Sequence, residues 1–309
     1  QTNSFADTLP LIALYAFAGY RLLPALQQIY ASLTQLRFAK PALDALHSDF
    51  MALSHIKRIP MRKKINLNEG IALKNISYSY PNSQRTALNN ININIPAKST
   101  VGIVGMTGSG KTSTVDIILG LLEPQKGELK VDGININENN RRAWQKTIGY
   151  VPQQIYLIDD TISANIAFGI DSNKIDEKAL LRAAKMSNLH DFIIKELPSG
   201  YDTIVGERGV RLSGGQRQRI AIARALYHQP QVLVFDEATS ALDNLTEKII
   251  MEAVHNLGDK ITVILIAHRL STVKVCENIY LLENGQVRSQ GRYRDLIIKD
   301  DEFRKMADV

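Results

Sequence analysis

The pattern of hydrophobic and polar positions changes near residue 69. From there onward, stretches that alternate apolar and polar residues, as half-buried strands do, are mixed with short continuous apolar runs and longer helical patterns. The expected strands are 71–80, 91–95, 101–104, 232–235 and 261–266, with hairpins at 127–136 and 278–290 and a helix at 111–122. Residues 161–229 are mostly helical in pattern. The sequence therefore predicts an α/β fold with an inserted helical subdomain.

The first part of the chain is dominated by an apolar stretch. Leu9–Tyr20 has no charged residue, and the pattern resumes after Arg21 and continues as a helix beyond residue 26. Twelve residues are too few to cross a bilayer, which needs about twenty. Periodicity alone therefore leaves two interpretations open: a membrane-spanning helix that continues into water, or an amphipathic helix buried in the protein. Residues 57–68 follow as a basic, proline-containing linker.

Composition narrows the class of protein. The chain has 309 residues, more than one core usually holds, and its 45% hydrophobic and 22% charged residues are typical of globular domains. These values argue against a disordered chain, a coiled-coil rod and a complete polytopic membrane protein. The one cysteine, Cys276, excludes an intramolecular disulfide and a thiolate zinc site, and it fits a reducing compartment.

The net charge of +6 is concentrated near the N-terminus. Residues 1–64 contain eight Lys or Arg and three Asp or Glu, whereas the rest of the chain is almost neutral. Basic residues beside an apolar stretch are typical of a cytoplasmic juxtamembrane segment. A solvated basic linker is the alternative. Because the main domain is nearly neutral, we expect no nucleic-acid partner.

A glycine-rich loop lies between the strand expected at 101–104 and the helix expected at 111–122. Its sequence, Gly105-Met106-Thr107-Gly108-Ser109-Gly110-Lys111-Thr112, fits the pattern G-x-x-x-x-G-K-[ST]. Glycines let the backbone curl so that consecutive N–H groups point at one anion, and the helix adds its positive N-terminal end. We expect Lys111 to reach the β- and γ-phosphates of a nucleoside triphosphate, and the Thr112 hydroxyl group to hold Mg²⁺.

A second motif is an apolar run that ends in two acids, Asp236 and Glu237. A buried strand would place Asp236 beside the metal, directly or through water. Glu237 would face the attacking water as the general base. Together with the glycine loop, this motif predicts a nucleoside triphosphatase.

A third motif, Leu212-Ser213-Gly214-Gly215-Gln216, precedes a helical run. Ser213 lies 23 residues before Asp236. The serine and the glycines offer a hydroxyl group and free backbone N–H groups at a helix start, which makes a second candidate anion site. Two such sites in one fold are unusual unless the second serves a nucleotide held by another copy of the domain.

With these three motifs in this order, residues 69–309 resemble the ATPase domain of ATP-binding cassette (ABC) transporters. The resemblance implies a P-loop NTPase fold with an antiparallel β subdomain and a helical subdomain at about 161–229, and it implies ATP and Mg²⁺ as ligands. The residues implied to bind ATP are Tyr80, Gly105, Met106, Thr107, Gly108, Ser109, Gly110, Lys111, Thr112, Ser113, Gln153, Ser213, Gly214, Gly215, Gln216 and Asp236. The implied Mg²⁺ ligands are Thr112, Gln153 and Asp236, and the implied catalytic residues are Lys111, Glu237 and His268.

The same resemblance gives individual residues their roles. Tyr80 would stack on adenine, Gln153 would contact Mg²⁺ and sense the transmembrane partner, and His268 would contact the γ-phosphate. Val205–Gly209 resembles the cross-talk loop of exporters, and Ser240–Asp243 resembles a loop that crosses the dimer interface. In this family two copies pair head to tail, so each ATP would lie between the glycine loop of one copy and the third motif of the other.

The N-terminal segment carries a resemblance of its own. Residues 8–50 resemble the last transmembrane helix of an exporter with its cytoplasmic extension, so residues 1–56 are expected to be the end of a transmembrane domain. The stretch 9–36 is similar to the bacterial flippases that move lipid-linked oligosaccharides for protein N-glycosylation. This resemblance implies a homodimer, a transmembrane domain of its own or of a partner, a lipid-linked glycan as cargo, and a bacterial inner membrane with the ATPase domain in the cytoplasm.

The sequence leaves alternatives to a flippase open. The cargo of an exporter could instead be another lipid, a peptide or a drug. Soluble cassette ATPases that act on nucleic acid usually separate the two halves with a long coiled coil, but only 102 residues separate Lys111 from Ser213. Importer subunits lack a fused helix, so the apolar stretch Leu9–Leu26 argues against an importer subunit. Glu237 argues against a module that binds without catalysis.

Overall fold

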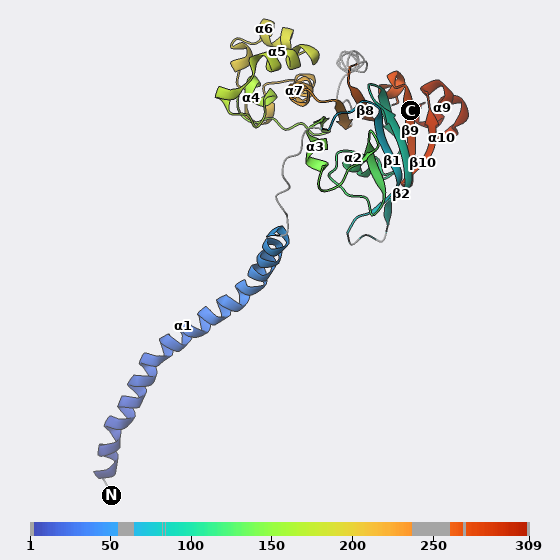
Figure 1. Cartoon of the computed structure of the whole chain (residues 1–309). Coiled ribbons are helices and arrows are strands. Elements are labelled where there is room, and N and C mark those ends of the chain that lie inside the picture. Colours follow the sequence, from blue (N-terminus) through green and yellow to red (C-terminus); the bar gives the residue numbers. More distant parts are fainter. Residues whose placement is uncertain are drawn as a thin grey trace. The chain divides into compact units, whose positions relative to one another are not determined.

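The computed structural model describes residues 3–54, 65–81, 83, 85–236, 260–267 and 270–307. Contacts divide the chain into two units, residues 1–60 and residues 61–309. Figure 1 labels the elements of both units.

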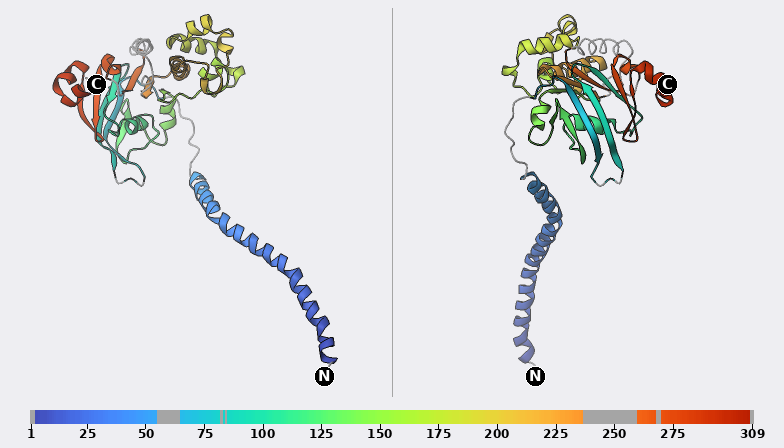
Figure 2. Two further views of the ribbon diagram at one scale, coloured as in Figure 1. Left: turned by 180° about the vertical axis from the view of Figure 1, so that it is seen from behind. Right: turned by 45° about the vertical axis from the view of Figure 1, so that its right-hand side comes forward.

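The first unit consists of α1 (Asn3–Ser54), a helix of 52 residues. At 1.5 Å per residue it is about 78 Å long, more than twice the hydrocarbon thickness of a bilayer. All side chains from 8 to 51 are exposed, and Thr8–Met51 is long and apolar enough to cross a membrane. Three prolines lie inside the helix, and its ribbon bends along its length (Figures 1 and 2). Length, composition and exposure thus favour the membrane-spanning interpretation.

The second unit contains the strands and shorter helices of the chain. Its strands are β1 (Gly70–Ser79), β2 (Thr86–Pro96), β3 (Thr100–Val104), β4 (Lys126–Val131), β5 (Ile134–Asn135), β6 (Ile148–Val151), β7 (Val232–Asp236), β8 (Thr262–Ala267), β9 (Asn278–Glu283) and β10 (Gln286–Gly291). Its helices are α2 (Lys111–Ile118), α3 (Arg141–Gln145), α4 (Ile162–Ile166), α5 (Glu177–Met186), α6 (His190–Glu196), α7 (Gly214–Tyr227), α9 (Tyr293–Lys299) and α10 (Asp301–Ala307).

The described strands form two sheets. An antiparallel sheet has the order β2-β1-β4-β5, and a larger sheet has the order β10-β9-β3-β8-β7-β6. In the larger sheet all neighbouring strands are parallel except β9 and β10, which form a hairpin. The predicted α/β fold with an antiparallel β subdomain is confirmed. Both predicted hairpins are also present, at β4–β5 and β9–β10.

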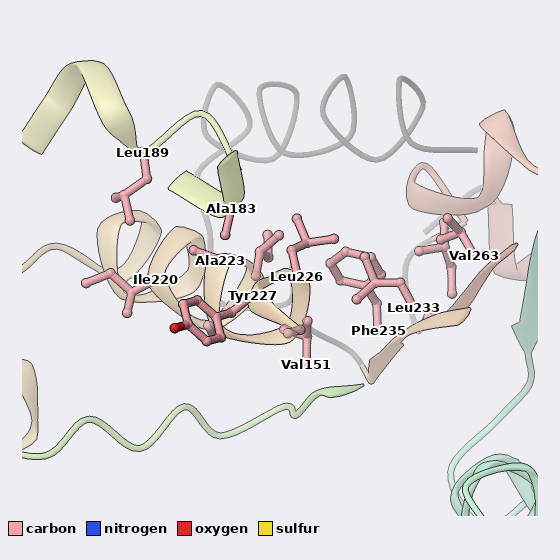
Figure 3. Packing of buried hydrophobic residues seen from close by; sticks show 14 of the residues in the cluster. Val151, Ala183, Leu189, Ile220, Ala223, Leu226, Tyr227, Leu233, Phe235 and Val263 are labelled. Carbon is pink, nitrogen blue, oxygen red and sulfur yellow. The ribbon is translucent and has the colours of Figure 1, made fainter. Parts of the chain in front are cut away.

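The central strands are buried on both faces, as their continuous apolar sequences predict. Val232 and Val234 of β7 pack with α2 and the antiparallel sheet, whereas the alternate residues Leu233 and Phe235 pack with the helical subdomain. In Figure 3, Leu226 of α7 lies beside Phe235 of β7. Helix α7 thus connects the larger sheet to the helical subdomain through one continuous core.

The segment 161–229 is largely helical, as predicted; a short turn joins α5 to α6, and longer connections with 3₁₀ turns join α4 to α5 and α6 to α7. Figure 2 shows these helices grouped away from β1 and β2. Asp176 caps the start of α5, and its carboxylate accepts hydrogen bonds from the backbone N–H groups of residues 178 and 179. The buried alanines of this helix, Ala179, Ala183 and Ala184, let α7 pack closely against it.

The helix predicted at 111–122 is shorter than expected, because α2 ends at Ile118. Gly120 has a φ of +66°, and its N–H donates to the Ile117 carbonyl group while the Leu121 N–H donates to the Asp116 carbonyl group. This pair of hydrogen bonds is the Schellman motif, which closes a helix and turns the chain away. The end predicted at residue 122 was therefore wrong.

Strand β2 is longer than the stretch 91–95 that alternation predicts, since it begins at Thr86. Asn90 has a φ of +55°, and the pairing with β1 shifts register on both sides of the Tyr78–Leu88 pair. Such irregularities interrupt the two-residue alternation of side chains, so the first part of the strand is hidden from a pattern search.

Asp132, in the turn between β4 and β5, holds the residues that lead into β1. Its carboxylate accepts hydrogen bonds from the backbone N–H groups of Asn68 (2.7 Å), Glu69 (2.9 Å) and Gly70 (2.9 Å). Leu67, inside the segment expected to be linker, is buried. Partial burial of Asp132 opposes ionisation, but the backbone donors outweigh it and hold the pKa of the carboxyl group below its usual value.

We predict that Asp132→Asn destabilises the chain at neutral pH by about 1 kcal/mol, because a charged acceptor of backbone donors is lost. The folded-state pKa lies below the unfolded-state value, so this stabilisation is present above about pH 4 and disappears as pH falls through the folded-state pKa. Urea unfolding at pH 7 and at pH 3 measures the difference. Asp159→Asn, at an exposed position, is the control. An equal loss at both pH values would contradict the prediction.

Candidate active site

Part of the predicted nucleotide site, namely the glycine loop, Gln153 and Asp236, lies at the carboxyl edge of the larger sheet. The glycine loop follows β3, Gln153 lies two residues beyond β6, and Asp236 is the last residue of β7. Because these strands are parallel, their carboxyl ends meet at the same edge, which is where α/β sheets bind ligands. Glu237, His268 and the loop 240–243 lie outside the described residues, so their roles stay predictions.

The glycine loop is curled by backbone conformations that only glycine adopts readily. Gly108 and Gly110 have φ values of +78° and +103°. A Cβ atom on Gly105 would lie 2.3 Å from the Leu282 carbonyl oxygen, and one on Gly110 would lie 2.8 Å from the Leu88 side chain. The loop therefore packs between the antiparallel sheet and the β9–β10 hairpin, with no space for side chains at these two positions.

The hairpin turn also holds the loop directly. The Gly285 N–H donates to the Ser109 carbonyl group (3.0 Å), and the Asn89 N–H donates to the Gly285 carbonyl group (2.7 Å). The Ser109 hydroxyl group is buried and has no hydrogen-bond partner among the described residues. The sequence predicted the glycine loop and the hairpin at 278–290 separately, but it did not predict their contact.

Lys111 is almost fully buried, with 5% of its surface exposed. Its ammonium group donates to the carbonyl groups of Gly105 (2.8 Å) and Met106 (3.2 Å), so the side chain folds back over the loop. A buried ammonium ion is stabilised only by such acceptors or by an anion. The cation thus lies inside the curl of the glycine loop, where the sequence predicts a phosphate group.

A pocket of about 250 Å³ lies beside the loop. It is lined by Tyr80, Ser83, Arg85, Ala87, Gly108, Gly110, Lys111, Thr112 and Ser113. The Tyr80 ring is 42% exposed, and its hydroxyl group lies 3.0 Å from the Ser113 hydroxyl oxygen. The structure thus places the aromatic side chain predicted to contact adenine next to the phosphate loop. Sequence reasoning missed Ser83, Arg85 and Ala87, whose proximity depends on how β2 packs.

The carboxylate of Asp236 is held by Tyr150 of β6, whose hydroxyl group donates to Oδ2 at 3.0 Å. Asp116 of α2 faces the same place: its pKa is raised by burial and by the negative charge of Asp236. Burial and the Asp236 charge also raise the pKa of Tyr150, so the phenol keeps its proton and remains a donor. Neither Asp116 nor the role of Tyr150 was predicted from the sequence.

The residues present suit Mg²⁺. This ion prefers oxygen ligands, and it is usually held by one or two carboxylates together with substrate phosphates. Asp236 supplies a carboxylate and Thr112 an exposed hydroxyl group beside Lys111. Within the described residues no three His, Cys, Asp or Glu side chains form a group that could hold a metal ion.

The third motif forms the start of α7. The Ser213 hydroxyl group accepts the Gln216 N–H (3.2 Å), and the Gln216 side chain accepts the Ser213 N–H (2.8 Å), which is a capping box. The serine oxygen is therefore already used to cap the helix, but its own proton can still be donated outward. Among the described residues, none of 212–216 lines the pocket beside the glycine loop.

The comparison with protein families decides the class. A model described as ABC transporter matches residues 88–240, which include the glycine loop, the third motif and Asp236. This chain carries an ABC transporter ATPase domain. The predicted ATPase is confirmed at the level of the family.

Proteins named as a flippase, a translocation ATP-binding protein and an exporter are similar to this chain. The chain is 44% identical to the ATP-dependent lipid A-core flippase of Saccharophagus degradans over 237 residues, which are 76% of this chain and 40% of that protein. It is 43% identical to the alpha-hemolysin translocation ATP-binding protein HlyB of Proteus vulgaris over 231 residues, 75% of this chain and 32% of that protein. The chain thus spans less than half the length of these curated relatives.

A solved structure described as a bacterial Atm1-family ABC exporter with ATP bound superimposes with a TM-score of 0.74 and 33% identity. The superposition covers 96% of this chain and 52% of that one, so it extends into α1. The predicted combination of one long N-terminal helix with an ABC domain is therefore confirmed. The membership also implies ATP as the nucleotide.

We predict that Lys111→Ala lowers ATP affinity about 30-fold, since a charged hydrogen bond to phosphate contributes about 2 kcal/mol. Equilibrium binding of a fluorescent ATP analogue measures the change. Lys178→Ala, which removes an exposed lysine from α5, is the matched control. Unchanged ATP affinity in a folded Lys111→Ala variant would contradict the phosphate-binding role.

Proposed function

We propose that this chain is the ATPase end of an exporter in which two copies share two ATP molecules. The observation that carries the proposal is that each ABC domain offers two incomplete anion sites. The glycine loop has a pocket with Tyr80 and Lys111 but no residue of the third motif, whereas Ser213 begins a separate helix. A second copy placed head to tail would complete both sites with its own third motif.

The chain's own groups would perform distinct parts of hydrolysis. Loop N–H groups and Lys111 would bind the phosphates, and Tyr80 would hold the base. Glu237 would accept a proton from the attacking water, and His268 would contact the γ-phosphate. Thr112, Asp236 and Gln153 would hold Mg²⁺, which neutralises charge on the phosphates when bound. The two copies would then close on each other only when the glycine loop of one and the third motif of the other bind the same triphosphate.

Helix α1 supports a place in the membrane. Its described side chains are exposed along Thr8–Met51, and residues 1–64 carry most of the net positive charge. Basic residues are retained on the cytoplasmic side of membrane helices. We therefore place the ABC domain in the cytoplasm at a bacterial inner membrane, where opening and closing of the pair would move the attached helices.

For the cargo we propose a lipid-linked oligosaccharide or a similar glycolipid. The resemblance of residues 9–36 to oligosaccharide flippases supports it, and a relative named as a lipid A-core flippase acts on a molecule of the same amphiphilic type. The relative named for alpha-hemolysin translocation makes a peptide exporter the second candidate.

We predict that Ser213→Arg prevents the ATP-dependent pairing, because the much larger side chain would occupy the space proposed for the partner's γ-phosphate. The test is made in a Glu237→Gln background, which should bind ATP and turn it over very slowly. Multi-angle light scattering in detergent, with and without ATP, measures the mass. Ser199→Arg, at an exposed serine of the helical subdomain, is the control. A normal ATP-dependent dimer of Ser213→Arg would overturn the shared-site proposal.

We predict that a polyprenyl-diphosphate-linked oligosaccharide stimulates ATP hydrolysis by the chain when it is reconstituted with its transmembrane domain in proteoliposomes. The comparison is an unfolded peptide at the same concentration. Stimulation by the peptide and not by the glycolipid would reject the cargo proposal in favour of the peptide exporter.

A further inference from the structure

The bond between Tyr150 and Asp236 follows from the register of two neighbouring strands. Strands β6 and β7 are parallel, and Tyr150 pairs with Val234. Side chains alternate along a strand, so Asp236, two residues beyond Val234, points to the same face as Tyr150. The tyrosine side chain is long enough to reach that diagonal neighbour, and its hydroxyl group lies 3.0 Å from Oδ2.

The same face is covered by α2, which places Asp116 nearby. Val234 packs in the same core as Val115 and Ile117 of α2, and the charge of Asp236 acts on Asp116. Two carboxyl groups without a cation between them repel each other. A phenol that donates to one of them opposes this repulsion and fixes the rotation of the Asp236 carboxylate. Because the bond uses Oδ2, Oδ1 is the oxygen that can turn toward a cation.

Tyr150 also connects the two segments that carry expected Mg²⁺ ligands. It lies three residues before Gln153 on the chain that leaves β6, and Asp236 ends β7. We propose that Tyr150 is a positioning residue for Mg²⁺, a proposal that rests on the proposed ATPase function. Tyr150 orients the Asp236 carboxylate and thereby sets the affinity of the site for the cation. Partners that orient metal-binding carboxylates in this way contribute about 10- to 100-fold to metal affinity.

The test compares the wild-type chain with Tyr150→Phe, which removes one oxygen atom and keeps the ring. Tyr150 is 39% exposed, so the variant buries no new polar group and leaves no cavity. Binding of a fluorescent ATP analogue is measured in EDTA and then as a function of Mg²⁺ concentration, and Mn²⁺ binding is followed directly by electron paramagnetic resonance. Tyr156→Phe, the same change at an exposed tyrosine of the following loop, is the control.

We expect Tyr150→Phe to bind the analogue in EDTA as the wild type does, and to need about tenfold more Mg²⁺ for half-maximal binding. The Mn²⁺ affinity should fall by the same factor, and hydrolysis should recover at saturating Mg²⁺. In an Asp236→Asn background, Tyr150→Phe should have no further effect on Mn²⁺ affinity, because the carboxylate it orients is gone.

Two outcomes would overturn the inference in different ways. If wild-type and Tyr150→Phe chains show the same Mg²⁺ and Mn²⁺ dependence, Tyr150 does not position the metal ligand, while the ATPase proposal stands. If the wild-type chain binds the nucleotide with no dependence on a divalent cation, the metal role of Asp236 is wrong, and the role of Tyr150 is wrong with it.

Discussion

The loop between β3 and α2 curls only because glycine occupies positions 105 and 110, and the rest of the candidate site is arranged around that curl. Neighbouring backbone would collide with a Cβ atom at Gly105. The inward turn lets the Lys111 ammonium group reach the carbonyl groups of the loop itself. The antiparallel sheet and the β9–β10 turn press on the loop from outside, since Gly285 donates to Ser109. The packing contacts that hold the fold together therefore also shape the candidate nucleotide site.

The parallel strands of the larger sheet also determine where the residues of the candidate site lie. Their carboxyl ends bring the glycine loop, Asp236 and the chain leading to Gln153 to one edge, although these segments are far apart in the sequence. Helix α7 starts elsewhere, and its first turn is capped by its own Ser213 and Gln216. Its core side chains join the sheet to the helical subdomain (Figure 3). Because this core is closely packed, a movement of Ser213 toward a partner's nucleotide would shift the side chains that join α7 to the sheet and to the helical subdomain.

Much of the fold and the phosphate loop could be predicted, because their signals are local. Strand alternation, two Asx-Gly hairpin turns and the spacing of Gly105–Lys111 lie within short windows of sequence. What escaped prediction depends on contacts between distant segments. Tyr150 and Asp236 are 86 residues apart, and Asp132 meets Gly70 across 62 residues. The end of α2 is different: Gly120 was a local signal, and the apolar residues after it masked the stop.

The central claim is that each ATP is gripped by the glycine loop of one copy and the third motif of another. Mixing Lys111→Ala chains with Ser213→Arg chains, both in the Glu237→Gln background, tests it most directly. A mixed pair has one intact composite site, whereas neither variant alone can form any. The account predicts that each mixed pair retains one ATP while each variant alone retains none. If the mixture retains no more ATP than the separate variants, although all are folded, the shared site does not exist.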